Sequence, residues 1–241
     1  MKRDVQRPKI AANREGFTLV ELLVVMAILG VLISLLFPAF SQAKMKAMDL
    51  RCTGQLRRIG GAFMQMLGDR NFKLVTHAWN SNYEQNIWPM LLEDGGYFEE
   101  RDALYCPVLP PDFDPYDDTK GGVLSWAHHV GYGLNMFERD YGHLRPMPHR
   151  GDRSDWVINY RAVPSPPDYL LLGESYLLGS GMSRYQISTP TASAVASPQA
   201  RHRSSQVMNV FFLDGHVEAC KEDRLNAVGI FGYFDADGNA L

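Results

Sequence analysis

The sequence has no excess of positive charge. Its 241 residues carry 24 Lys and Arg against 27 Asp and Glu, which gives a formal net charge of −3. A protein whose main partner is nucleic acid needs a basic face to neutralise phosphates, so this balance argues against that class. Charged residues make up 21% of the chain, an ordinary fraction that also argues against a disordered, self-repelling tail.

Catalytic and repeat patterns are missing as well. We find no internal repeat, no Ser-His-Asp order, no glycine-rich loop that would cradle a phosphate and no defensible pair of catalytic carboxylates. Cysteine is scarce: the three residues lie at positions 52, 106 and 220, and spacings of 54 and 114 residues match no zinc-binding pattern. The sequence therefore predicts a protein that is not an enzyme.

What the chain does contain is one long apolar segment, residues 17–40. As a helix, these 24 residues span about 36 Å, enough to cross a hydrocarbon core of about 30 Å. The residues before the segment carry a net charge of +3, because two acidic residues are outnumbered by Lys2, Arg3, Arg7, Lys9 and Arg14. Positive flanks stay cytoplasmic, so we expect the N-terminus inside and residues 41–241 on the outer side of the membrane.

Glu21 is unexpected in this apolar segment. A charged side chain in a membrane-spanning helix costs about 2.5–3.5 kcal/mol near the centre and less toward an interface, and is by default functional. A secretory signal peptide has a shorter apolar region and a small-residue cleavage site, so it does not fit. A simple membrane anchor accounts for the length and the charge bias, but not for Glu21 or for Gly16.

Residues 16–25, GFTLVELLVV, resemble the processing site of type IV prepilins and type II secretion pseudopilins. The resemblance implies that a prepilin peptidase in the membrane cleaves between Gly16 and Phe17 and methylates the new Phe17 amine. It also implies that Glu21, the fifth residue of the mature chain, serves assembly. Pro38 lies where many helices of this family bend or locally melt.

The resemblance also implies partners. A buried carboxylate needs a positive partner, so Glu21 of one subunit would pair with the free Phe17 amine of a stacked neighbour. The expected partners are the membrane, like subunits, the prepilin peptidase and the platform that assembles a secretion pseudopilus or a pilus. Without residues 1–16 the chain keeps 19 basic and 25 acidic residues, a net charge of −6, and no nucleic-acid partner is expected.

Beyond the apolar segment the chain continues as an amphipathic helix. Apolar residues recur at steps of three and four, the period of a helical stripe, at Met45, Met48, Cys52, Leu56, Ile59, Phe63 and Met66. A stop is predicted at Gly68-Asp69, and Pro38 predicts a kink or short break near the membrane surface. We therefore divide the chain into a leader (1–16), a transmembrane assembly helix (17–40), an amphipathic helix half (41–68) and a globular head (69–241).

The head contains four candidate strands, at residues 169–173, 207–213, 216–220 and 228–234. Irregular loops are predicted where prolines or polar residues gather, at residues 107–122, 139–155, 163–168 and 188–206. Asp214-Gly215 between two apolar strands indicates a tight hairpin, in which glycine supplies a positive φ. The order predicts an α+β, pilin-like fold, with a long N-terminal helix packed on a small antiparallel sheet with long loops.

This hairpin resembles the C-terminal motif of a prepilin-like subgroup, in which a histidine and a spacer precede Asp-Gly. The matching residues are Arg201, His202, Asn209, Phe212, Asp214, Gly215, His216 and Val217. The spacer between His202 and Asp214 is two residues longer than is usual in that subgroup. Cys106-Pro107 and residues 131–135, GYGLN, also look like landmarks of the subgroup.

Exported cysteines can form a disulfide, and three of them allow one bridge and one remaining thiol. We favour Cys52–Cys106, which would tie the helix to the head. A Cys106–Cys220 bridge and three buried thiols stay open as alternatives.

Ligand sites are not firmly indicated. His202, Asp214 and His216 are residues of types that can bind a metal. Because the turn itself requires Asp214, no firm metal site is predicted. Residues 235–239 resemble the first part of a calcium loop that lacks its later glutamate. Calcium at Asp235, Asp237 and Asn239 stays a candidate, and no other cofactor is expected.

These features together predict a structural pilin-like subunit that sits in the inner membrane and then enters a type IV pilus or a type II secretion pseudopilus. Two other functions stay open. One is a membrane-anchored protein whose head binds a polysaccharide or a protein, with the prepilin helix used only for export. The other is an anchored metal-dependent enzyme that uses His202, Asp214 and His216.

Overall fold

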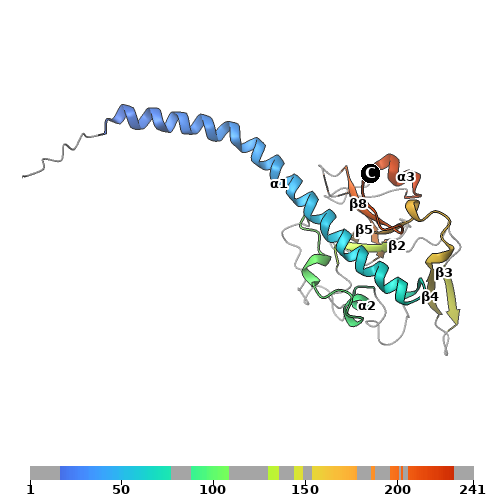
Figure 1. The fold of residues 1–241 in the computed structure, drawn as a ribbon. Coiled ribbons are helices and arrows are strands. Elements are labelled where there is room, and N and C mark those ends of the chain that lie inside the picture. Colours follow the sequence, from blue (N-terminus) through green and yellow to red (C-terminus); the bar gives the residue numbers. More distant parts are fainter. Residues whose placement is uncertain are drawn as a thin grey trace, which may run out of the picture. The chain divides into compact units, whose positions relative to one another are not determined.

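The computed structural model describes residues 17–76, 88–108, 130–135, 144–148, 154–177, 186–187, 196–200, 202 and 206–230. Its helices are α1 (Leu19–Asp69), α2 (Trp88–Asp94) and α3 (Glu222–Ala227), with 3-10 turns η1 (Arg101–Leu104), η3 (Tyr160–Ala162) and η4 (Pro166–Asp168) (Figure 1). Its strands are β1 (Lys73–Thr76), β2 (Tyr132–Asn135), β3 (Leu144–Pro148), β4 (Ser154–Asn159), β5 (Leu170–Leu177), β6 (Gln186–Ile187), β7 (Ala196–Pro198), β8 (Met208–Phe212) and β9 (Val217–Cys220). Gly16, Arg201, Asp235, Asp237 and Asn239 lie outside the described residues.

Helix α1 runs for 51 residues without interruption. Pro38 lies inside it, so the predicted break is wrong, whereas bending at Pro38 stays a prediction. The helix ends at the expected place, but Asn71 and Phe72 make the turn, with φ of 57° and 59°. The chain divides into two compact units, one up to Met45 and one from Lys46, and each is described by itself.

The described residues of the unit from Lys46 form two sheets. In the larger one the strands follow the order β6-β2-β5-β8-β9, and β7 pairs with β5. The four strands β2, β5, β8 and β9 pair antiparallel in that order, while β6 runs parallel to β2. The smaller sheet has the order β1-β4-β3. The predicted fold class, a long N-terminal helix packed on a small antiparallel sheet, is confirmed.

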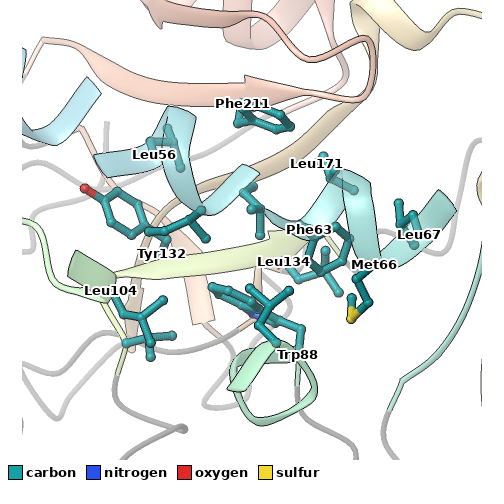
Figure 2. Packing of buried hydrophobic residues seen from close by; sticks show 14 of the residues in the cluster. Leu56, Phe63, Met66, Leu67, Trp88, Leu104, Tyr132, Leu134, Leu171 and Phe211 are labelled. Atoms are coloured by element: carbon teal, nitrogen blue, oxygen red, sulfur yellow. The ribbon is translucent and has the colours of Figure 1, made fainter. Parts of the chain in front are cut away.

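The core of this unit lies between the last part of α1 and the larger sheet. The predicted helical stripe is buried from Cys52 onward, whereas Met45 is exposed. Figure 2 shows Leu56, Phe63 and Met66 of α1 among side chains of α2, β2, β5 and β8. The rings of Phe63 and Trp88 meet edge to face with centroids 6.0 Å apart. This packing places the residues around Cys52 against the centre of the sheet.

Gly60 is required by this packing. A Cβ built on Gly60 would collide with the ring of Phe211 on β8, while a Cβ on the adjacent Gly61 meets nothing within 4 Å. The close approach of α1 to β8 therefore depends on Gly60 and not on Gly61.

Three local predictions for the head are wrong. Of the strand predicted at 228–234, residues 228–230 are not a strand: Val228 caps α3, and Gly229 turns the chain with a φ of 82°. Residues 231–234 lie outside the described residues. The loop predicted at residues 139–155 is not wholly irregular, because it contains β3 and the start of β4. The loop predicted at residues 188–206 contains β7. β3 contains Pro146 and Pro148 and lies at the edge of its sheet among the described strands, the position where proline is tolerated because an N–H that faces away from the partner strand makes no ladder bond.

Candidate functional site

The first candidate site is the N-terminus of α1, where Thr18 and Glu21 cap the helix. The backbone amide and the hydroxyl of Thr18 both donate to Oε2 of Glu21, at 2.9 and 2.7 Å. The amide of Glu21 in turn donates to Oγ1 of Thr18 at 3.3 Å. This reciprocal arrangement is a capping box, which satisfies backbone donors that the first turn leaves unpaired. Glu21 therefore has a role within its own chain.

Sequence reasoning missed this role, although Thr-x-x-Glu before an apolar run is its ordinary signature. Phe17, the expected new N-terminus, lies next to Thr18 and is 73% exposed. Cleavage before Phe17 would leave Thr18 and Glu21 intact, so the cap survives processing.

The stem from Leu19 to Phe40 has no apolar partner among the described residues. All of its large hydrophobic side chains are exposed. An 18-residue window of α1 reaches a mean hydropathy of 2.9, and the helix is long and apolar enough to cross a membrane. This single apolar helix fits membrane anchoring.

The second candidate site is a buried cluster of charged side chains in the head, centred on His202. Its Nε2 lies 2.5 Å from Oε1 of Glu174 on β5, and its Nδ1 contacts Oδ1 of Asp49 on α1. The side chains of His202 and Glu174 are 1% and 0% exposed, and that of Asp49 is 21% exposed. An imidazole thus bridges two carboxylates and links the helix to the sheet.

Asn209, another residue of the C-terminal motif, completes this cluster. Its backbone amide donates to Oε2 of Glu174 at 3.1 Å, and its Nδ2 donates to Oε1 at 3.3 Å. Its own Oδ1 accepts from the hydroxyl of Thr53 on α1 at 3.5 Å. His202 and Asn209 therefore hold Glu174 from two sides and both reach α1, despite the longer spacer after His202.

The charges around His202 set its protonation. Burial by itself disfavours the imidazolium, but hydrogen bonds and charge interactions with Glu174, and then with Asp49, outweigh burial and raise the pKa of His202 above its ordinary value. A buried carboxylate is expensive unless it is paired, and a protonated His202 supplies the pair.

A disulfide lies beside this cluster. It joins Cys52 of α1 to Cys106 after η1, with the Cα atoms 5.5 Å apart. Sγ of Cys106 lies 3.6 Å from Nε2 of His202 and 3.9 Å from Oε1 of Glu174. The remaining cysteine, Cys220, is buried, and this burial raises the pKa of its thiol to about 12.

The predicted Asp-Gly hairpin is present, and its loop has three residues. Gly215 has a φ of 95°, and its amide donates to the carbonyl of Phe212 at 3.0 Å. Leu213, Asp214 and Gly215 therefore form a three-residue loop, in which glycine adopts the left-handed conformation. The predicted need for glycine is correct at this position.

Asp214 and His216 bond to each other rather than to His202. Oδ1 of Asp214 accepts from the backbone amide of His216 at 3.1 Å and lies 2.5 Å from its Nδ1. Partial burial opposes ionisation of Asp214, but these hydrogen bonds outweigh it and lower the pKa of its carboxyl. The structure thus places the three residues of the suggested metal enzyme in two separate groups.

Sequence reasoning found His202 and Asn209 but missed their partners, Asp49 and Glu174. The sequence around each missed residue gives a weak indication of its role. Glu174 interrupts an apolar strand, and Asp49 lies one helical turn before Cys52 and Thr53. Only the pairing of β5 with β2 and β8, against α1, brings these acids to one imidazole.

Comparison with known families matches residues 11–37 to the model described as the prokaryotic N-terminal methylation motif. The match includes Gly16, Phe17 and Glu21, and it supports the type IV pilin or pseudopilin family expected from the sequence. It covers the end of the leader and most of the stem but no residue of the head, so the His-spacer-Asp-Gly subgroup rests on the residues of the head alone. Comparisons with curated proteins and with solved structures found no match.

Proposed function

We propose that this chain is the precursor of a structural pilin-like subunit. A prepilin peptidase cleaves it between Gly16 and Phe17 and methylates the Phe17 amine. The apolar half of α1 first holds the subunit in the inner membrane, with the N-terminus in the cytoplasm and the head outside. The subunit then enters a type IV pilus or a type II secretion pseudopilus.

The observation that carries this proposal is the exposed apolar stem that begins with a methylation motif. Its side chains find no packing partner in the described part of the chain, so lipid or the stems of other subunits must cover them. Helices in a membrane associate through close packing and polar contacts between side chains. The stem supplies the packing surface, and Glu21 is its one charged side chain from Leu19 to Phe40.

The capping box at the start of α1 explains how Glu21 can serve two partners. Both hydrogen bonds from Thr18 go to Oε2. Once the leader is removed, Oε1 can accept from the Phe17 ammonium of a neighbour without breaking the cap. A carboxylate held in one orientation pairs more readily than a mobile one, because less side-chain entropy is lost. Thr18 thus orients Glu21 for assembly.

Two substitutions separate capping from pairing. Glu21→Gln keeps a capping side chain, because glutamine serves at this position, but it removes the charge. We expect Glu21→Gln to insert into the membrane and to be cleaved normally, but to be strongly depleted from sheared surface fibres. Thr18→Ala removes the two hydrogen bonds made by the Thr18 hydroxyl and keeps the charge and the bond from the backbone amide, so its incorporation should fall less. Cysteine crosslinking between neighbouring stems measures incorporation when no fibre is visible.

Normal incorporation of Glu21→Gln would contradict the pairing. A protein that is processed but stays in the membrane, with no crosslinks between stems, would favour the anchored binding protein instead.

A further inference from the structure

We propose that the head binds one zinc ion when the Cys52–Cys106 disulfide is reduced, through the thiolates of Cys52 and Cys106, a carboxylate oxygen of Glu174 and Nε2 of His202. The disulfide seen in the structure is then the oxidised, metal-free state of the same site. This inference does not depend on the proposed role in a filament, since it concerns the head alone.

The four donor atoms already lie together. One ligand atom from each residue lies within 4.8 Å of the other three, and all four residues are buried. A tetrahedral zinc ion with ordinary bond lengths places a sulfur about 3.5 Å from a nitrogen or oxygen ligand and two sulfurs about 3.8 Å apart. The distances from Cys106 Sγ to His202 Nε2 and to Glu174 Oε1 are 3.6 and 3.9 Å. The two sulfurs, and the contact between His202 and Glu174, need to open, and Cys52 Sγ starts within 4.8 Å of the other ligand atoms.

The surroundings orient both the imidazole and the carboxylate. Nδ1 of His202 faces Asp49, which keeps Nε2 directed toward the cysteines and Glu174. A carboxylate on the far nitrogen is the usual partner of a zinc-bound histidine, because it sets the tautomer and strengthens the ligand. Asn209 holds Glu174 through two hydrogen bonds. These contacts would be kept when the metal enters.

The donor set indicates which metal binds. Thiolates select soft or borderline ions such as zinc over calcium or magnesium, which require oxygen ligands. Four buried protein ligands leave no open position for water, so the site is structural rather than catalytic. Two thiolates beside Glu174 would be a costly buried cluster of negative charge, and a divalent cation compensates it.

Reduction and metal binding are two separate steps, and each exchanges protons with its surroundings. A dithiol reductant breaks the S–S bond, gives two electrons and two protons to the sulfurs, and becomes a disulfide itself. Zinc then displaces both thiol protons and any proton on Nε2 of His202, and these protons pass to the solvent. Because Cys52 lies on α1 and Cys106 after η1, the metal would tie the helix to the head as the disulfide does.

The test uses the full chain purified in detergent. One sample stays oxidised, and another is reduced with dithiothreitol, which is removed under nitrogen before zinc is added. We expect one zinc ion per reduced chain in equilibrium with a colorimetric chelator and no stoichiometric zinc in the oxidised chain. Cobalt(II) added to the reduced chain should give tetrahedral visible bands and thiolate charge-transfer absorption.

Variants assign the ligands. Cys106→Ser, Glu174→Gln and His202→Gln should each lower zinc affinity at least tenfold, and Asp49→Asn should lower it about 10–100-fold. His216→Gln is the matched control, since this histidine also contacts a carboxylate but lies in the exposed hairpin; its affinity should equal that of the wild type. Cys220 is retained throughout and gives a constant background thiol.

The proposal fails if the reduced chain, with all three thiols titratable, takes up no stoichiometric zinc. It also fails if Glu174→Gln and His202→Gln bind as tightly as the wild type. Should reduction unfold the head, recovery of its near-ultraviolet circular dichroism on zinc addition supports the site, and no recovery overturns it.

Discussion

Helix α1 is one continuous element, but its two halves differ in how their apolar side chains are covered. From Leu19 to Met45 its large apolar side chains are exposed, whereas from Cys52 to Leu67 its apolar stripe is buried in the head. The second half gains its stability within the chain through contacts such as the edge-to-face packing of Phe63 on Trp88. No described residue packs on the large apolar side chains of the first half, so we expect lipid or other chains to supply comparable stability there.

This difference shows that regular helical structure alone does not tell what a helix packs against. The stem is apolar on every side, as expected of a segment in lipid, while the second half carries a stripe with a polar opposite face. Substitutions in the second half should therefore change the stability of one chain. Substitutions in the first half should change insertion and assembly instead.

The largest expected effect comes from matched phenylalanine substitutions in the two halves. Phe63→Ala should lower the free energy of unfolding of the head by about 3–5 kcal/mol, because it opens a cavity against Trp88. Phe37→Ala, at a residue that is 73% exposed, should change that free energy by less than about 0.5 kcal/mol. Denaturant unfolding in detergent, followed by near-ultraviolet circular dichroism, measures the free energy of unfolding of both variants. Equal losses of this free energy would contradict the proposed difference between the two halves.

Alanine substitutions at two adjacent glycines should change the stability by smaller amounts. The two changes should be opposite to each other in sign. Gly60→Ala should destabilise the head by about 1–3 kcal/mol, because the new methyl group meets the ring of Phe211. Gly61→Ala meets nothing and should stabilise the helix by up to about 1 kcal/mol. The thermal midpoints of the two variants should therefore move in opposite directions, and a rise for Gly60→Ala would show that α1 does not approach β8 closely.

The smallest effect is a pH dependence carried by His202 in the oxidised, metal-free chain. The pKa of His202 is raised in the folded state, so its stabilising contribution is complete below the unfolded value of about 6.5 and is lost as the pH rises through the folded value. The wild type should lose stability relative to His202→Gln over this range. Asp49→Asn should weaken the effect, and parallel pH profiles for the wild type and His202→Gln would refute it.

Local patterns in the sequence predicted the long helix, its end near Asp69 and the strands β5, β8 and β9, because periodicity and turn residues act over a few positions. The same reasoning missed β3, since Pro146 and Pro148 argue against a strand unless its edge position is known. An apolar run at 228–234 suggested a strand, but Gly229 turns the chain after α3.

The two candidate sites also differ in how far the sequence alone could predict them. The stem motif is contiguous, so Gly16, Phe17 and Glu21 were recognisable in one short run. The cluster around His202 draws Asp49 from α1 and Glu174 from β5, and no spacing along the chain relates them. Sites assembled from distant segments require the fold, which is why only the motif residues His202 and Asn209 were found.

The most direct test is the mass of the N-terminal peptide of the chain isolated from the membranes and fibres of its native cell. The account predicts a peptide that begins at Phe17 and carries one additional methyl group on its amine. A chain that begins at Met1 in every fraction, with no form trimmed after Gly16, would contradict it.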